Sequence, residues 1–433
     1  MAPTDHDNFT TLFHCYDCIG RKRLKVLVIG SGGREHAIAW KLSRSPSISK
    51  IYAAPGNPGI ATIAECLERT DYLALAKELA IDLAVVGPEA PLVAGVVDQF
   101  RAAGIPIVGP TAECAQLEGS KLYSKRFMER IGIPTARFVT ATNRQQAQDA
   151  FHLFNYPLVL KTDGLAAGKG VIIAQNLAES REAAAQLNYP LVIEEFLVGE
   201  EVSFIVLSDG KTAVPFEPSQ DHKTAFDGDT GPNTGGMGAY SDSLILTMAQ
   251  REEVMRLIIE PVLAETGFTG FLYAGLMMTG TGPKVLEFNV RMGDPETQPL
   301  MMRMTSDFGL ALFAAATGTL QPGHFKWDPR PSTCVVLASG GYPGAFPTGF
   351  AITGIDDFEN AIVFHAGTKR TQFSELVTSG GRVLGVTALG NNLKSSMDVV
   401  YTAIQKIHFS GMQYRKDIGA KGLRRYNVEE QGT

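Results

Sequence analysis

Short apolar runs alternate with helix-like stretches near the start of the chain, between Leu24 and about Pro110. Four of these runs are predicted to be buried strands: Lys25–Ile29, Lys50–Ala54, Asp82–Val86 and Ile105–Val108. Strands that are separated by helices need crossover connections, which place them parallel in one sheet with helices on both faces. We therefore predict an N-terminal doubly wound parallel sheet.

Length and pattern divide the chain into three folded blocks, because 433 residues exceed what one hydrophobic core holds. We predict a Rossmann-like domain over residues 24–124, a central domain over 125–328 with a small subdomain over about 125–196, and a small α+β domain over 329–433. The fold class is therefore α/β and α+β multidomain. Residues 1–23 are polar and irregular, and we expect a disordered or non-native extension there.

The composition excludes several classes of protein. Hydrophobic residues make up 45% and charged residues 19% of the chain, which is typical of a globular protein. The net charge of −6 argues against nucleic acid as a general partner, and no apolar run has the length of a membrane span. Five scattered cysteines fit a reducing compartment, so we expect a cytoplasmic location. Cys15 and Cys18 beside His14 lack a second ligand pair, and we interpret them as a chance pair.

The segment Val285–Arg291 carries the strongest signal of chemistry. Glu287, Asn289 and Arg291 alternate with apolar residues, and on a strand this period places all three on one face. A carboxylate and an amide oxygen suit Mg²⁺, and a guanidinium beside them suits a phosphoryl group. An ordinary amphipathic strand with a solvated face has the same pattern, so neighbouring motifs have to decide.

A glycine turn, Gly30–Gly33, joins the first predicted strand to a helix that begins near Arg34. Backbone N–H groups and the helix dipole at such a turn favour an anion. The turn lacks the full dinucleotide pattern, and the second strand ends without an acidic residue for a ribose diol. We interpret it as a phosphate site without a nicotinamide cofactor, and the alternative is a plain tight turn.

Two further segments fit a nucleotide. The loop from Lys161 to Val171 is rich in glycine but lacks the P-loop pattern, and its backbone N–H groups and lysines suit a lid over phosphates. The alternative there is a plain mobile hairpin. The segment Glu194–Glu201 turns at Gly199, so its backbone suits the edge of an adenine and its acids suit ribose hydroxyls. Taken alone, that segment is equally typical of an acidic turn.

Three polar loops are predicted to line a pocket for a small polar substrate. They are Ser219–Lys223, Asp229–Gly238 and Gly293–Pro299, which have little packing value and let the backbone approach a ligand closely. His222 lies in the first of them and fits a surface loop equally well. We expect no acid–base role for it.

In this order, the segments resemble those of the ATP-grasp ligases, and more closely those of the phosphoribosylamine–glycine ligase (glycinamide ribonucleotide synthetase) family. The resemblance runs from Lys25 to near Tyr426, and it is most specific at Thr230–Tyr240 and at Glu287 with Gly293–Gln298. It implies that the central block is an ATP-grasp domain whose small subdomain is a lid.

The resemblance implies a reaction. ATP-dependent ligation of glycine to 5-phosphoribosylamine gives glycinamide ribonucleotide, ADP and phosphate through a glycyl phosphate intermediate, as the second step of de novo purine (IMP) biosynthesis. No protein nucleophile is needed, and catalysis depends on positioning and electrostatic stabilisation. The implied partners are the small molecules ATP, glycine and 5-phosphoribosylamine, and we expect a monomer or a weak homo-oligomer.

The resemblance also implies roles for particular residues. Glu287 and Asn289 hold Mg²⁺ or Mn²⁺, and the catalytic set is Arg291, Lys161 and Asp294. The implied ATP-binding set is Lys121, Lys161, Gly164, Gly168, Lys169, Gly170, Glu194, Glu195, Phe196, Leu197, Glu200 and Glu201. The implied substrate-binding set is Gly32, Gly33, Arg34, Asp229, Thr234, Gly235, Gly236, Met237, Gly238 and Asp294.

The chain departs from the family between Val171 and Leu191, where it is shorter than expected and has room for one helix. This shortening bears on lid closure and on the Michaelis constant for ATP. We expect no further catalytic domain after Arg415–Gly419. Three other functions fit parts of the sequence: another ATP-grasp ligase or carboxylase, a non-catalytic nucleotide-binding protein, and a nicotinamide dehydrogenase. The intact set of Lys161, Glu287, Asn289 and Arg291 argues against a protein that has lost its chemistry.

Overall fold

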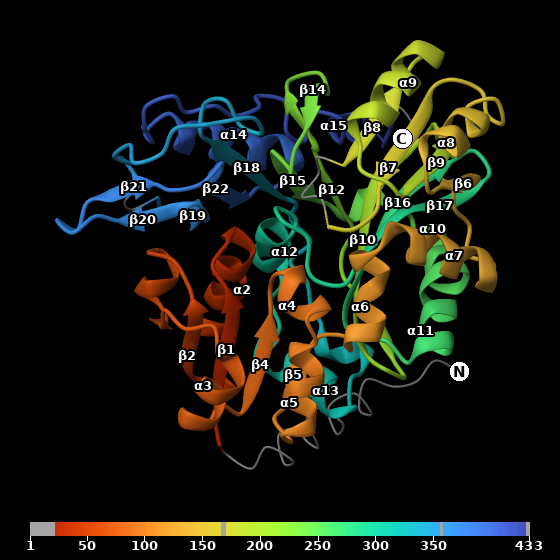
Figure 1. Cartoon of the computed structure of the whole chain (residues 1–433). Coiled ribbons are helices and arrows are strands. Elements are labelled where there is room, and N and C mark those ends of the chain that lie inside the picture. Colours follow the sequence, from red (N-terminus) through yellow and green to blue (C-terminus); the bar gives the residue numbers. More distant parts are fainter. Residues whose placement is uncertain (1–21, 166–169, 356–357, 430–433) are drawn as a thin grey trace.

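The computed structural model describes residues 22–165, 170–355 and 358–429. The predicted extension before residue 22, the pair Cys15 and Cys18, and the lid residues Gly168 and Lys169 lie outside this part of the chain. Figure 1 shows the N-terminal sheet (red to orange) and the lid sheet (yellow) beside one long sheet, whose last strands (blue) belong to the C-terminal part. None of the helices in the described residues is long and apolar enough to cross a bilayer.

The N-terminal sheet confirms the predicted doubly wound fold. Its strands are β1 (Leu24–Gly30), β2 (Ile48–Pro55), β3 (Glu65–Cys66), β4 (Leu83–Val86) and β5 (Ile107–Val108). They pair in parallel in the order β3-β2-β1-β4-β5. The flanking helices are α2 (Gly33–Ser43), α3 (Tyr72–Glu78), α4 (Glu89–Val93), α5 (Val96–Ala102) and α6 (Ala112–Gly119). Only the two-residue strand β3 escaped prediction, because so short a strand has no period.

The lid subdomain is a separate four-stranded antiparallel sheet of order β6-β9-β7-β8. Its strands are β6 (Phe138–Ala141), β7 (Leu158–Thr162), β8 (Val171–Ala174) and β9 (Leu191–Glu195). The helices are α7 (Lys121–Ile131), which leads into it, α8 (Arg144–Ala150) and α9 (Leu177–Gln186). Apolar residues of α8 and α9 share one core with the strands. The single helix α9 fills the shortened connection between Val171 and Leu191, as expected.

One nine-stranded sheet joins the centre of the molecule to its C-terminal part. Its path is β17-β16-β10-β12-β15-β18-β22-β19, and β11 pairs with β10 at the side. The strands are β10 (Glu200–Asp209), β11 (Ala213–Pro215), β12 (Ser219–Asp221), β15 (Gly238–Ser241), β16 (Thr269–Thr279), β17 (Gly282–Asn289), β18 (Ser332–Ala338), β19 (Ile362–His365) and β22 (Arg382–Leu389). Because β15 pairs with β18, the sheet runs across the domain boundary that we predict near residue 328.

The remaining elements cover this sheet or project from it. The helices are α10 (Met248–Val254), a π-helical turn (Met255–Ile259), α11 (Glu260–Thr266), α12 (Thr297–Arg303), α13 (Phe308–Thr317), α14 (Leu393–Ile404) and α15 (Leu423–Glu429). The hairpins are β13 (Thr224–Phe226) with β14 (Thr230–Asn233) and β20 (Thr368–Arg370) with β21 (Leu376–Thr378). Two predicted loops were therefore wrong in part, since Ser219–Lys223 contains β12 and Asp229–Gly238 contains β14. These short strands are held by pairing to their neighbours, which no local pattern reveals.

A buried polar seam joins the N-terminal and C-terminal domains. The N–H of His365 donates to Nδ1 of His36 at 2.8 Å, and the Asn57 amide donates to the carbonyl oxygen of His365 at 2.8 Å. Burial, together with the neighbouring His365, lowers the pKa of His36 to about 3. Burial, together with Arg370, lowers the pKa of His365 to about 4. Both imidazoles are therefore neutral at neutral pH.

Acid is expected to weaken this seam. The unfolded chain binds a proton at His36 near pH 6.5 but the folded protein only near pH 3, so stability present above pH 6.5 is lost as the pH falls towards 3. From pH 7 to pH 5 the free energy of unfolding should fall by about 2 kcal/mol on account of His36. Urea unfolding of the wild type and of His36→Gln at both pH values measures this. The variant should lose less stability on acidification, and equal losses would contradict the prediction.

Candidate active site

A cavity of about 1390 Å³ opens where the N-terminal, lid, central and C-terminal parts meet. Most of the predicted site residues line it, which brings together segments that are far apart in the sequence. They are Arg34, Lys121, Lys161, Gly164, Gly170, Glu194, Glu195, Phe196, Leu197, Glu200, Glu201, Asp229, Thr234, Gly235, Glu287, Asn289, Arg291 and Asp294. Gly32, Gly33, Gly236, Met237 and Gly238 are not among the lining residues.

The end of β17 presents two oxygen ligands to the cavity. Glu287 lies opposite Gly275 of β16, and its side chain is 42% exposed. Burial raises the pKa of Glu287, but Lys223, Lys161, Lys121 and Arg291 outweigh this effect and hold the pKa below its usual range. The carboxylate is thus ionised, and the Asn289 amide follows it on the same strand. This donor set fits a hard divalent cation.

The two oxygens cannot form a complete metal site by themselves. The described residues contain no group of three or more His, Cys, Asp or Glu side chains arranged to hold a metal ion. Mg²⁺ typically takes one or two protein ligands and completes its shell with phosphate oxygens and water. The donor set therefore fits a cation that arrives with a nucleotide.

Carboxylates of the N-terminal domain position Arg291, which lies just beyond the end of β17. Its Nη2 is 2.8 Å from Glu118 Oε1, and its Nε is 3.5 Å from Glu89 Oε2. Glu118 also accepts the N–H of Val290 at 2.8 Å, and Arg291 donates to Asn289 Oδ1 at 3.2 Å. The guanidinium is therefore fixed beside the two oxygen ligands. The strand period predicts Arg291 on this face, but the strand ends at Asn289, so the contacts with Glu118 and Glu89 hold the guanidinium there.

Two lysines share one buried carboxylate on the lid side of the cavity. Lys161 pairs with Glu194 Oε1, and Lys125 Nζ lies 2.5 Å from Glu194 Oε2. Burial raises the pKa of Glu194, but the two lysines outweigh it and lower the pKa overall. Lys161 also donates to the carbonyl oxygen of Leu286 at 3.1 Å. Since the Glu194 side chain is taken up by these lysines, only its backbone is left for the predicted contact with adenine.

Lys121 begins α7 and reaches the first described residues of the glycine loop. Its Nζ donates to the carbonyl oxygen of Gly164 at 2.7 Å, and no ion-pair partner for it occurs among the residues that the structure describes. Ser120 caps the helix and donates to Asp163 at 2.9 Å, which fixes the start of that loop. Lys121 is therefore a cation whose charge is available to a ligand.

The connection between β9 and β10 forms an exposed apolar edge of the cavity. Phe196 and Val198 are exposed there, while Leu197 is buried. Glu195 pairs with Arg137 at 2.9 Å. Of the two acids at the start of β10, Glu200 pairs with Arg425, and Glu201 lies 3.1 Å from Lys223 Nζ. The edge thus combines a flat apolar surface with two carboxylates.

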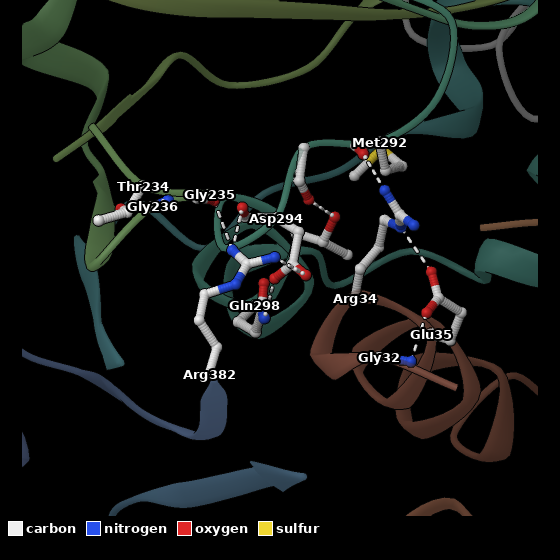
Figure 2. Close-up of polar contacts among 12 residues, drawn as sticks. Gly32, Arg34, Glu35, Thr234, Gly235, Gly236, Met292, Asp294, Gln298 and Arg382 are labelled. Atoms are coloured by element: carbon white, nitrogen blue, oxygen red, sulfur yellow. Dashed lines mark hydrogen bonds and ion pairs between the residues drawn. The ribbon is translucent and has the colours of Figure 1, made fainter. Parts of the chain in front are cut away.

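The anion position at the start of α2 is filled by the protein itself. The Gly32 N–H donates to Glu35 Oε2 at 2.5 Å, and Arg34 pairs with Glu35 Oε1 at 2.5 Å and donates to the Met292 carbonyl at 3.2 Å (Figure 2). A Cβ atom at Gly33 would lie 2.8 Å from Gln298 Nε2. Of the predicted set of Gly32, Gly33 and Arg34, only Arg34 lines the cavity, and the phosphate contacts of the two glycines stay predictions.

The predicted substrate loop Asp229–Gly238 meets the cavity only in part. Asp229 lies 3.1 Å from Arg415 and 2.5 Å from Lys421, and Thr234 and Gly235 line the wall. The Met237 side chain is fully buried, and a Cβ atom at Gly238 would lie 2.7 Å from the carbonyl oxygen of Cys334. Gly236, Met237 and Gly238 do not line the cavity, because this end of the segment leads into β15 within the sheet, and their predicted substrate contacts stay predictions.

His222 is buried beside this loop and is not a surface residue. Burial, with Arg415 and Lys421 nearby, lowers its pKa to about 4. Its Nε2 accepts the N–H of Gly419 at 3.4 Å. The imidazole is therefore neutral at neutral pH, and it lines the cavity.

Three consecutive stretches of the chain match one set of family models. They are the N domain (residues 24–118), the ATP-grasp (A) domain (residues 119–297) and the C domain (residues 332–421) of phosphoribosylglycinamide synthetase. The chain belongs to the phosphoribosylglycinamide synthetase family. The resemblance seen in the sequence is thereby confirmed, and the chain is an ATP-dependent carbon–nitrogen ligase of the ATP-grasp type.

Known proteins agree with this membership. A phosphoribosylamine–glycine ligase of Xanthomonas axonopodis pv. citri is 50% identical over 425 residues, which cover 93% of this chain and 99% of the relative. The crystal structure of a phosphoribosylamine–glycine ligase from Thermotoga maritima matches with a TM-score of 0.78 and 33% identity, over 91% of this chain and 100% of that one. The biotin carboxylase domain of Hydrogenobacter thermophilus 2-oxoglutarate carboxylase, crystallised with MgADP, matches with a TM-score of 0.69 at 18% identity over 91% and 92% of the two chains, and so shares the fold.

Several residues of this synthetase cavity escaped the sequence analysis. Glu118, Lys125, Tyr342 and Arg382 all line the cavity, and none of them was assigned a role from the sequence. Lys125 follows Lys121 by one helical turn, so the period of α7 was a usable signal. Arg382 directly follows Gly380 and Gly381, a glycine pair of the kind that singled out the other loops. Glu118 had no local signal.

Proposed function

We propose that this cavity joins glycine to 5-phosphoribosylamine at the expense of ATP, giving glycinamide ribonucleotide, ADP and phosphate, in de novo purine biosynthesis. An oxygen of the glycine carboxylate attacks the γ-phosphorus, and the bond to the β-phosphate oxygen breaks, which gives glycyl phosphate and ADP. The ribosyl amine then attacks the carbonyl carbon, phosphate leaves, and the amine loses a proton. The observation that carries this proposal is one cavity that combines phosphate-binding cations, the two-oxygen strand end and the polar acceptor loops.

The nucleotide is assigned to the lid half of the cavity. Lys121 and Lys161 bind its phosphates, together with the backbone from Gly164 to Gly170. The adenine lies against Phe196 and Leu197, and the acids of β10 receive the ribose. Glu287 and Asn289 hold the divalent cation, Mg²⁺ or Mn²⁺, which neutralises charge on the phosphate oxygens when it is bound.

The acceptor substrates are assigned to the opposite half. Arg291 stabilises the γ-phosphoryl group and the acyl phosphate, because Glu118 and Glu89 fix its guanidinium there. Asp294, Thr234 and Gly235 shape the pocket for glycine and ribosylamine. Burial raises the pKa of Asp294, but Arg382 and Arg34 outweigh it, so that this carboxylate stays ionised and accepts hydrogen bonds from an amine.

Phosphate release tests the reaction directly. The protein is mixed with ATP and Mg²⁺, with glycine, and with or without freshly generated 5-phosphoribosylamine. We expect sustained phosphate release only when both acceptors are present. Release that needs bicarbonate in place of glycine, or that ignores ribosylamine, would contradict the proposal and favour another ATP-grasp ligase or carboxylase.

We propose the cellular location of the enzyme from its sequence. Five scattered cysteines support a location in the cytoplasm. We also propose a monomer or a weak homo-oligomer, which light scattering coupled to gel filtration measures at several protein concentrations.

A further inference from the structure

A single arginine of the C-terminal domain bridges two loops of the acceptor half. Arg382 begins β22, and its Nη1 donates to the carbonyl oxygens of Gly235 at 2.5 Å and Asp294 at 2.7 Å. Its Nη2 donates to Asp294 Oδ2 at 2.9 Å. Figure 2 shows the guanidinium pointing between these two loops. The segment after β14 and the segment after β17 are thus tied to the same side chain.

The two loops have further supports on either side of this arginine. The Asp294 carboxylate accepts from Gln298 Nε2 at 2.9 Å through its other oxygen. The Gly235 N–H donates to the hydroxyl of Tyr342 at 3.0 Å, so both sides of this glycine are held by residues of the C-terminal domain. A planar guanidinium with several fixed donors suits such bridging, and a lysine cannot reproduce it.

The arrangement is specific to one half of the cavity. Arg382 contacts residues that shape the acceptor pocket, whereas the cations assigned to the nucleotide lie on α7 and β7. Loss of this side chain would leave the partly buried Asp294 carboxylate without its charged hydrogen-bond donor and free the Gly235 carbonyl to move. The nucleotide half keeps all of its own contacts.

We propose that Arg382 is a positioning residue through which the C-terminal domain sets the acceptor pocket. It fixes the Gly235 peptide and the Asp294 carboxylate in the arrangement that glycine and ribosylamine need. This inference depends on the proposed function, and it makes the C-terminal domain part of acceptor selection.

Kinetics of Arg382→Gln, Arg382→Lys and Tyr342→Phe test this role. For Arg382→Gln we expect kcat/KM for both acceptors to fall about 30-fold, the size typical of lost charge-assisted hydrogen bonds. Arg382→Lys should recover only a small part of this loss, and Tyr342→Phe should lose about 3-fold. The dissociation constant for ATP, measured by calorimetry, should change by less than about twofold in each variant.

The matched control is Arg330→Gln. Arg330 also pairs with an aspartate, Asp328, at 2.7 Å, but it is 48% exposed and does not line the cavity. We expect its kinetics to match the wild type. If Arg382→Gln does not fold, Tyr342→Phe decides the question, because it removes only one hydroxyl.

The outcomes separate this inference from the proposed function. Wild-type protein that releases no phosphate with both acceptors would contradict the proposed function itself. If the wild type turns over but Arg382→Gln keeps its acceptor kinetics, only the role of Arg382 is overturned. Where Arg382→Gln does not fold, unchanged acceptor kinetics in Tyr342→Phe have the same meaning. An equal loss of ATP affinity and acceptor kcat/KM would also overturn it, since a general loss of structure explains that result.

Discussion

Replacement of Glu287 by glutamine is expected to reduce turnover by at least about 10³-fold while the protein stays folded. Glu287 is the ionised oxygen donor at the end of β17, and a neutral amide there binds a divalent cation far more weakly. Its side chain is 42% exposed and lies 3.7 Å from Lys223 Nζ, so an amide of the same shape disturbs little packing. The effect should therefore appear in kcat and not in the melting temperature.

Phosphate release and thermal unfolding of Glu287→Gln, measured in parallel, check this expectation. Glu265→Gln is the matched control, because Glu265 is 39% exposed, pairs with Arg130 and lies outside the cavity. It should match the wild type in both measurements. Normal turnover in Glu287→Gln would refute the assignment of this residue to the metal.

Replacement of Glu194 by alanine is expected to destabilise the lid sheet by about 3–5 kcal/mol. Glu194 is only 2% exposed and neutralises both Lys125 and Lys161, which are buried beside it. Without it, two ammonium groups of like charge face each other in a poorly solvated site. Hydrogen exchange at the backbone of β7 and β9 measures the local free energy of opening.

The neighbouring residue on the same strand gives a control for this prediction. Glu195 pairs at the surface with Arg137, whose side chain is 70% exposed, so Glu195→Ala should cost less than about 1 kcal/mol. Equal losses of the local free energy of opening in the two variants would show that Glu194 does not stabilise the two buried lysines. The pairing also predicts that Glu194→Ala loses ATP affinity, because Lys161 is displaced.

The elements of this fold were predictable where burial repeats at short range. Strands β1, β4 and β5 are almost wholly buried because helices cover both faces of the sheet, and such apolar runs are visible in the sequence. Strands β12 and β14 were not predictable, since their polar and glycine-rich residues gain strand structure only by pairing with neighbours. Strands with a strong local run of apolar residues were therefore predicted, whereas strands without one were not.

The candidate site divides in the same way. Glu287 and Asn289 could be nominated as metal ligands from the sequence because both lie on one strand, where alternation places them on the same face. The filled anion position at Gly32 was not foreseeable, because a helix start looks the same in sequence whether a ligand or its own Glu35 occupies it. Glu118 and Arg382 act on motifs more than 80 residues away in the chain, so only the folded structure reveals them.

The continuous central sheet also determines where binding has an entropic cost. Pairing of β15 with β18 joins the C-terminal domain rigidly to the acceptor loops. In contrast, the described strands of the lid sheet do not pair with the central sheet, and one isolated bridge, Thr135 to Val285, connects the segment before the lid to it. Glycine and ribosylamine therefore enter a pocket that is already ordered. The conformational freedom that the protein loses on binding is therefore that of the lid, which closes on the nucleotide. Of the three substrates, ATP should bind with the most unfavourable entropy.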